Sequence, residues 1–421
     1  MPHKARAHVT VREHEAIPYS ILGGANASRL ENFVERSGIR LFDFGRHSVK
    51  ARSFVGLVRV GDQTIQVLPK IFEREAENLA LLLILLTYTR NLRIRKTGLA
   101  SIEASRGSFL EVWIRHFAEE LNRLLLRDPR RRYRDERERV PFIKGKLLFQ
   151  EDIAGQSKLD ARYPCRFQVF DANHRLYQLL KYCNGLLLRL TAVHATKNIL
   201  LQNDLLLASV EPRAFTRQEA DSIRLTRLDR AYEPVLELSR LILARSTLDL
   251  RAGRISALAF VFDMNVLFEQ FVAEFIRRHK AEIRLGEGRT LAEAEPQYKI
   301  GKLFGEFRMQ VDLRLRDDAG AEVLLDTKYK RLDGEKAHKG LSQTDFYQMF
   351  AYANAGSTKF DEIVLLYPTT ASVRQSFSSG QQRLHVTDID VRRMVDLKQG
   401  SVDVGAAVAE FSRAFVALGA A

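Results

Sequence analysis

The chain has 421 residues, of which 46% are hydrophobic and 28% charged, and its formal net charge is +14. This composition is typical of a globular protein with two or three domains, and the excess of positive charge favours a polyanionic partner such as nucleic acid. Two cysteines are too few for a zinc ribbon or an iron–sulfur cluster, and the longest aliphatic run, Leu79 to Leu86, is far shorter than the roughly 20 residues that cross a bilayer, so we expect no membrane association.

In chain order, residues 1–70 are predicted to form a β-rich N-terminal domain. The first six residues lack an apolar signal segment, which together with the low cysteine content predicts a cytoplasmic protein. Two apolar runs, Phe54 to Val60 and Gln63 to Leu68, flank Gly61-Asp62. A glycine in the first turn position suits a type II′ turn, so these runs predict a β-hairpin.

Residues 71–255 are predicted to form a mainly helical region. The helical patterns run from Glu77 to Thr87, Ser108 to Leu126, His174 to Val193 and Ser222 to Leu248. Trp113, the only tryptophan, falls in the second pattern and is expected in the core. A loop region is expected up to about residue 165, and residues 249–262 are expected to be a connector to the last domain.

A basic stretch lies between the second and third helical patterns. Arg127 to Arg139 contains seven arginines among four acidic residues, which indicates an exposed loop or a frayed helix. Arg130, Arg131 and Arg132 are candidate contacts to DNA phosphates or to an acidic partner, and a solvated face is an equally good interpretation. Lys144 and Lys146, on either side of Gly145, are better candidates for such a contact.

Residues 256–421 are predicted to form a third domain that carries the chemistry. Val266 to Ile276 has a helical period, and Glu269 falls at the rim of its apolar face. Glu269 is therefore a candidate third acid of a site, with a simple edge residue as the alternative.

Two aspartates farther along lie on neighbouring predicted strands. Side chains alternate with period two, so Asp312 faces away from Val311 and Leu313, and Asp326 shares a face with Lys328. The turn-like residues 317–321 predict a hairpin, and pairing of Arg316 with Glu322 would place Asp312 opposite Asp326. Carboxylates about 4.5–5.5 Å apart repel each other unless a cation lies between them.

This pattern predicts a metal-dependent phosphodiesterase. Oxygen ligands favour Mg²⁺ or Mn²⁺, which activates water and stabilises charge on a phosphate. Lys328 would project into the same site, orient the attacking water and offset negative charge. The alternative is a solvent-facing ladder of salt bridges.

A helix and a strand complete the predicted core. Ser342 and Asp345 have the spacing of a capping box, and the following helix carries Gln348 and Tyr352 on one face. Ile363 to Pro368 is predicted to be a buried parallel strand, and Ala406 to Leu418 a C-terminal helix. The predicted fold class is α/β, or α+β overall, with a mixed sheet flanked by helices in the last domain.

The motifs Glu269, Asp312, Asp326-Thr327-Lys328 and Gln348-x-x-x-Tyr352 resemble the PD-(D/E)xK nuclease superfamily, in its branch with a Q-x-x-x-Y helix. The wider chain resembles the McrC family of restriction subunits. The stretches that carry this resemblance are Phe54 to Asp62, Leu68 to Lys70, Val140 to Lys146, Cys165 to Asp171 with Asn173, and Asp345 to Tyr352.

The resemblance implies a restriction-endonuclease-like core and a set of roles. Asp312, Asp326, the Thr327 carbonyl and Glu269 would hold Mg²⁺ or Mn²⁺, Lys328 would be the catalytic lysine, and Gln348 and Tyr352 would support the site. The proline that often precedes the first aspartate is absent, since Gln310-Val311 stand there.

The resemblance also implies partners. The chain would cut DNA in a modification-dependent restriction system and stimulate a separate, McrB-like AAA+ GTPase, which would dock on the helical region. The absence of a G-x-x-x-x-G-K-[S/T] loop fits this division, because the motor would be another polypeptide. Two alternatives are a non-catalytic activator of an AAA+ partner and a stand-alone nuclease of the same fold.

Overall fold

The computed structural model of the chain describes most of its residues. These are residues 8–37, 40–60, 63–90, 108–152, 162–245, 257–303, 306–330, 332, 341–354, 360–368 and 374–418. The predicted turn at Gly61-Asp62 lies outside the described residues.

The chain divides into two compact units. Unit 1 combines Met1–Phe109 with Leu248–Ala421, and unit 2 is the insertion Leu110–Thr247 between them. The β-rich N-terminal part and the C-terminal part are therefore one unit by this division. The three-domain boundaries after residues 70 and 255 stay a prediction.

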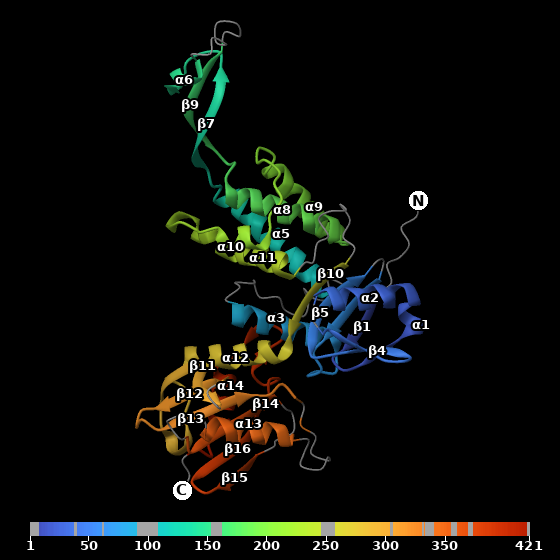
Figure 1. Ribbon diagram of the computed structural model, residues 1–421, viewed down its shortest axis with the longest axis vertical. Coiled ribbons are helices and arrows are strands. Elements are labelled where there is room, and N and C mark those ends of the chain that lie inside the picture. Colours follow the sequence, from blue (N-terminus) through green and yellow to red (C-terminus); the bar gives the residue numbers. More distant parts are fainter. Residues whose placement is uncertain are drawn as a thin grey trace. The chain divides into compact units, whose positions relative to one another are not determined.

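A four-stranded sheet lies in the N-terminal part of unit 1 (Figure 1). Its strands, in spatial order, are β1 (His8–Arg12), β6 (Gln63–Leu68), β5 (Phe54–Val60) and β10 (Ala257–Asp263). The expected hairpin is confirmed as β5 and β6. The expected connector at 249–262 is wrong in its second half, because β10 pairs antiparallel with β5 over its whole length.

A smaller sheet and two helices cover the four-stranded sheet. The strands are β2 (Ala16–Pro18), β4 (Ser48–Ala51) and β3 (Phe42–Phe44), and the helices are α1 (Tyr19–Leu22) and α2 (Gly24–Ser37). Ile17, Leu30 and Val49 from this layer share one buried core with Val67 and Val261 of the larger sheet. Strand β10 therefore belongs to the core of the N-terminal part.

The C-terminal part of unit 1 is built on a six-stranded mixed sheet. Its strands, in order, are β11 (Leu291–Leu303), β12 (Phe307–Asp317), β13 (Glu322–Thr327), β14 (Glu362–Pro368), β16 (Gln382–Ile389) and β15 (Gln375–Ser379). β13, β14 and β16 are parallel, and the remaining pairs are antiparallel. The predicted hairpin, the parallel strand and the mixed character of the sheet are confirmed.

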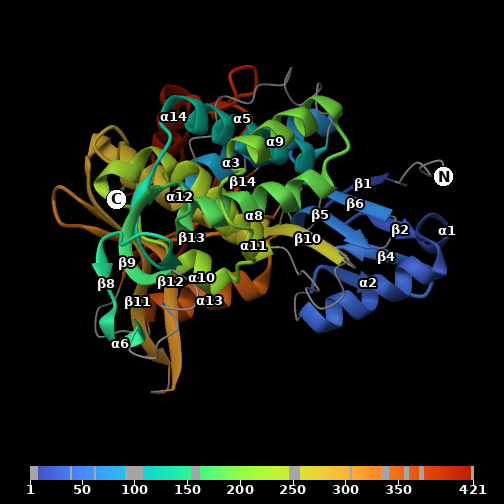
Figure 2. The same ribbon diagram turned by 90° about the horizontal axis from the view of Figure 1, so that it is seen from above.

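Helices flank this sheet, as the sequence predicts. Unit 1 contains α3 (Glu75–Arg90), α12 (Met264–His279), α13 (Gln343–Asn354) and α14 (Val404–Ala414), with the short elements η2 (Gly286–Gly288), β17 (Val395–Asp396) and β18 (Ser401–Val402). Met349 and Ala353 of α13 pack on Leu324 and Leu365 of the sheet. Helices α12 and α14 contact the sheet as well, and Figure 2 shows α13 and α14 on opposite sides of it.

Unit 2 is helical with a β-ribbon. Its helices are α5 (Phe109–Arg127), α8 (Arg175–Leu190), α9 (His194–Leu206), α10 (Arg217–Ser222), η1 (Arg227–Tyr232) and α11 (Glu233–Arg245). Buried amides join them: Asn203 donates to the carbonyl of Ala118 at 3.0 Å, and Asn184 donates to that of Leu200 at 2.9 Å. Trp113 is buried, as expected.

Two predictions for unit 2 are wrong. The basic stretch was expected to be a loop or a frayed helix, but from Arg132 onward it is a strand, β7 (Arg132–Val140), paired with β9 (Tyr163–Asp171). The loop expected up to about residue 165 also contains β8 (Lys146–Leu147), which pairs with β9, and α6 (Phe149–Asp152). Figure 1 shows β7 and β9 leaving the helices of their unit as a ribbon. The single helix expected from Ser222 to Leu248 is interrupted: α10 ends at Ser222, Thr226 forms a capping box with Asp229 that starts η1, and α11 follows.

Within the part of the chain that the structure describes, no helix has both the length and the apolar character needed to cross a membrane.

Candidate active site

The site begins at the open end of the β12–β13 hairpin. The observed pairs run from Arg316 with Glu322 to Leu313 with Leu325, which is the predicted register. The next residues in that register are Asp312 and Asp326, and the ladder between these strands ends just before them. The two aspartates therefore stand opposite each other where the strands part.

The carboxylate of Asp312, rather than a backbone carbonyl of β12, accepts the hydrogen bond of the Thr327 backbone N–H. Its Oδ2 accepts a bond from the backbone N–H of Thr327 at 2.7 Å and from the Thr327 hydroxyl at 2.6 Å. Both bonds use the same oxygen, so Oδ1 remains available as a ligand. Thr327 thus orients Asp312 through two groups.

Asp326 and Lys328 form an ion pair on the same edge. The distance between Lys328 Nζ and Asp326 Oδ2 is 2.5 Å, and the Asp326 side chain is only 3% exposed. Burial, followed by the charge of Asp312, raises the pKa of Asp326 to about 7. Burial lowers the pKa of the Lys328 amine, but the negative charges of Asp326 and Asp312 outweigh this effect, so the pKa is raised overall.

Helix α13 supplies two further side chains. Gln348 Oε1 accepts a hydrogen bond from Lys328 Nζ at 3.0 Å, and Gln348 Nε2 donates to the Tyr352 hydroxyl at 2.7 Å. The four-residue spacing places both on one helical face, as the sequence indicated. The structure therefore brings Asp312, Asp326, Lys328, Gln348 and Tyr352 together.

Asp345 was not considered a site residue from the sequence. Its carboxylate, expected to complete a capping box, instead accepts bonds from Lys330 Nζ at 2.9 and 3.0 Å and from the Tyr367 hydroxyl at 3.2 Å. Lys330 lies two residues beyond Lys328, so this network ties the start of α13 to the segment that carries the lysine. The sequence did place Lys330 on the same strand face as Asp326 and Lys328, and an acidic partner for Lys330 near that face could have been expected from this alternation.

Glu269 lies on α12 near the two aspartates. Gln297 donates a hydrogen bond to its carboxylate, and Gln310 donates to Gln297. Burial, followed by the charge of Asp312, raises the pKa of Glu269 to about 7. Among the described residues, no three His, Cys, Asp or Glu side chains lie close enough together to hold a metal ion. The structure thus places Glu269 within electrostatic reach of the site, held by an amide.

The donor set fits a hard divalent cation. Asp312, Asp326 and the Thr327 carbonyl are all oxygen donors, which Mg²⁺ and Mn²⁺ prefer. The pKa of buried Asp326 is raised partly because a second carboxylate stands beside it, so a cation would relieve that repulsion.

The basic residues proposed from the sequence lie in unit 2. Arg130 pairs with Asp128 and Arg132 with Asp229, whereas Arg131 is exposed. Lys144 Nζ stands 4.1 Å above the Phe167 ring, and Lys146 is exposed on β8.

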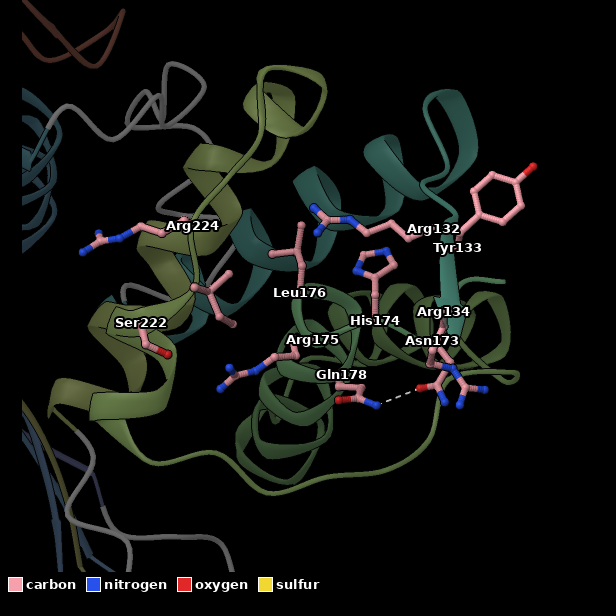
Figure 3. Close-up of a pocket in the computed structure, with 11 residues that line it drawn as sticks. Arg132, Tyr133, Arg134, Asn173, His174, Arg175, Leu176, Gln178, Ser222 and Arg224 are labelled. Carbon is pink, nitrogen blue, oxygen red and sulfur yellow. Dashed lines mark hydrogen bonds between the residues drawn. The ribbon is translucent and has the colours of Figure 1, made fainter. Parts of the chain in front are cut away.

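Arg132 also lines a surface pocket of about 400 Å³ around His174 (Figure 3). Burial, followed by the charge of Arg132, lowers the pKa of His174 to about 4, so this ring is neutral at pH 7. Arg132 therefore both pairs with Asp229 and lines this pocket.

Comparison with known proteins identifies the family. The family model described as "McrBC 5-methylcytosine restriction system component" matches residues 49–368, about three quarters of the chain. The chain belongs to this McrBC family. A search of curated protein sequences gave no match.

Solved structures agree on the fold. One chain in the assembly of Thermococcus gammatolerans McrB AAA+ hexamers with bound McrC is 18% identical, with a TM-score of 0.73, and the match covers 97% of this chain and 99% of that one. A chain in the cryo-EM structure of the Thermococcus gammatolerans McrBC complex is 21% identical, with a TM-score of 0.53, over 66% of this chain and 90% of that one. This member of the McrBC family thus shares its fold with chains of such complexes.

Proposed function

We propose that this McrBC family member is the DNA-cleaving subunit of a modification-dependent restriction system. It would be a metal-dependent endonuclease that hydrolyses phosphodiester bonds. The observation that carries the proposal is the meeting of Asp312, Asp326 and Lys328 at one edge of the sheet, with the amine 2.5 Å from a carboxylate oxygen.

Asp312, Asp326 and the Thr327 carbonyl would hold Mg²⁺ or Mn²⁺, with Glu269 as a further ligand or a support. The cation would stabilise charge on the scissile phosphate and lower the pKa of an attacking water. Lys328 Nζ would orient that water and offset the developing negative charge. Gln348 holds the amine by a hydrogen bond at 3.0 Å, and Tyr352 holds Gln348.

The proposed partner is a separate AAA+ GTPase of the McrB type. The similar chains come from structures that contain McrB AAA+ hexamers or the McrBC complex, which supports such a partner for this chain. The motor would recognise modified DNA and hydrolyse GTP, while this chain would cut. The formal net charge of +14 fits a DNA substrate.

The test is cleavage of a 5-methylcytosine-containing plasmid by the full chain, with Mg²⁺, GTP and the cognate motor. We expect Asp326→Ala and Lys328→Ala each to lower cleavage by at least about 100-fold, because each removes a group that acts on the reacting phosphate. Stimulation of the motor's GTPase should stay near that of the unmodified chain. Asp318→Asn, an exposed aspartate in the turn of the same hairpin, is the matched control and should cut normally.

Each outcome separates the proposal from its alternatives. Cleavage that survives Asp326→Ala would show that the acids are wrongly assigned. GTPase stimulation without any cleavage by the unmodified chain would favour a non-catalytic activator. Cleavage at full rate without the motor would favour a stand-alone nuclease.

A further inference from the structure

The residue after Lys328 makes an unexpected long-range contact. Tyr329 is 6% exposed, and its hydroxyl donates a hydrogen bond to Glu13 Oε2 at 3.2 Å. The two residues are 316 positions apart in the sequence. This bond therefore joins the Asp-x-Lys segment of the six-stranded sheet to the N-terminal sheet of the same unit.

Glu13 follows β1 directly, and backbone hydrogen bonds hold the chain there. Its backbone N–H donates to the Leu68 carbonyl at 3.0 Å, and the next residue, His14, has a left-handed φ of 65° and donates to the Ala51 carbonyl. The chain turns sharply there and leaves the Glu13 side chain 2% exposed. Burial outweighs the nearby charge of Lys70 and raises the pKa of Glu13 to about 8. A buried acid of this kind lowers the stability of the folded chain unless it has a hydrogen-bond partner, and Tyr329 is such a partner.

Tyr329 also contacts the helix that carries Glu269. Its ring lies 5.8 Å from the ring of Phe268, the neighbour of Glu269 on α12. Helix α12 follows β10 directly, and the N–H of Met264 donates to the Ser53 carbonyl at 2.9 Å. The N-terminal sheet thus holds α12 by chain continuity and Tyr329 by a hydrogen bond.

Regular pairing stops beside Lys328, so side-chain contacts hold the segment beyond it, among them Tyr329 with Glu13 and Lys330 with Asp345. The N–H of Lys328 donates to the Leu366 carbonyl at 2.9 Å, just past the last residue of β13. The next side chain is Tyr329, so its anchor limits the movement of the Lys328 backbone on the far side. A shift of about 1 Å in a catalytic group can lower a rate by as much as 100-fold.

We propose that Glu13 and Tyr329 form a positioning pair for the nuclease reaction, in which the N-terminal sheet holds Lys328 beside Asp326 and Gln348. This role rests on the proposed nuclease function and deepens it. Neither residue touches the reacting phosphate, and the pair acts through the backbone of Lys328 and through α12.

The test uses the full chain with its motor, GTP, Mg²⁺ and modified plasmid. Tyr329→Phe keeps the ring against Phe268 and removes only the hydroxyl. We expect the maximal cleavage rate to fall about 10-fold, as for other residues that support a site from behind, while the KM for DNA and the motor's GTPase stimulation stay unchanged. Glu13→Leu should have the same effect, and Glu13→Gln, which keeps an acceptor oxygen, should restore most of the rate.

Two comparisons separate positioning from simple stability. Tyr19→Phe removes another tyrosine hydroxyl bond in the N-terminal part, to the Gly45 carbonyl at 2.9 Å, and should leave cleavage unchanged. The double variant Tyr329→Phe/Glu13→Leu should be no slower than either single variant, because both remove the same contact.

Full-rate cleavage by Tyr329→Phe would overturn the positioning role alone. An equal loss in Tyr19→Phe, or a rate loss that disappears when cleavage is measured well below the melting temperature, would overturn it as well. Absence of cleavage by the unmodified chain under every condition would instead overturn the proposed nuclease function, and the positioning role with it.

Discussion

The raised pKa of Asp326 leads to an unusual expectation for the stability of the Asp326→Asn variant. We expect this change to make the metal-free protein more stable at pH 8, although it removes a proposed metal ligand. The reason is that burial and the neighbouring Asp312 raise the pKa of Asp326 from its usual 3.8 to about 7. Ionised Asp326 is therefore unfavourable in the folded chain when no cation is bound.

The sign and size follow from proton linkage. Because the folded chain holds this proton more tightly than the unfolded chain, the stability that it contributes is complete below about pH 4 and is lost as the pH rises to about 7. Each tenfold change in proton affinity is worth about 1.4 kcal/mol, so the loss is on the order of 4 kcal/mol at pH 8. Asparagine does not ionise, so D326N should keep that free energy and melt roughly 5 °C higher.

The assay is thermal unfolding of the full chain at pH 5 and pH 8, with EDTA or with excess Mg²⁺. In EDTA, D326N should exceed the unmodified chain in melting temperature at pH 8, and the difference should shrink at pH 5. Mg²⁺ should stabilise the unmodified chain, because a ligand that binds only the folded state raises its stability. It should have little effect on D326N.

Two results would refute this reasoning. D326N that melts below the unmodified chain at pH 8 in EDTA would show that the ion pair with Lys328 outweighs burial. Equal stabilisation of both proteins by Mg²⁺ would show that Asp326 is no ligand.

Two further predictions concern other residues of unit 1. Gly56→Ala should lower the free energy of unfolding by more than about 1 kcal/mol, measured as a lower melting temperature. The residue has a φ of 127°, and an added Cβ would clash with the Phe260 carbonyl oxygen. Gly185→Ala, in open space on α8, is its matched control and should stabilise instead. The Mg²⁺ concentration that gives half-maximal cleavage should change less with pH in Glu269→Gln than in the unmodified chain, between pH 6 and 8. The substitution removes one of two acids whose pKa is raised to about 7 and whose ionised form favours the cation, and an unchanged slope would contradict this.

The hairpin with the two aspartates could be predicted from the sequence because its information is local. Period-two alternation and a short turn determine the register, and the observed pairing of Arg316 with Glu322 follows from them. The Gln348 helix is similar, since a four-residue spacing decides its face. Whether these residues catalyse cleavage stays a prediction.

Elements that depend on distant partners could not be predicted in this way. Strand β7 has little hydrophobic alternation of its own, and pairs such as Tyr133 with Phe170 and Asp135 with Arg166 across β9 hold it. Strand β10 resembled a connector because its partner β5 lies far earlier in the chain. Glu13 carried no local signal at all, since its contact with Tyr329 exists only after the sheets are assembled.

The edge position of β10 has a consequence for synthesis of the chain. Nearly 200 residues separate the end of β5 from the start of β10, and all of unit 2 lies between them. At about 5–20 residues per second, a ribosome needs on the order of 10 to 40 s to cover that distance. During this time the N-terminal sheet exposes the unpaired backbone of β5, so nascent chains should recruit chaperones or pair with one another until β10 emerges and covers that edge.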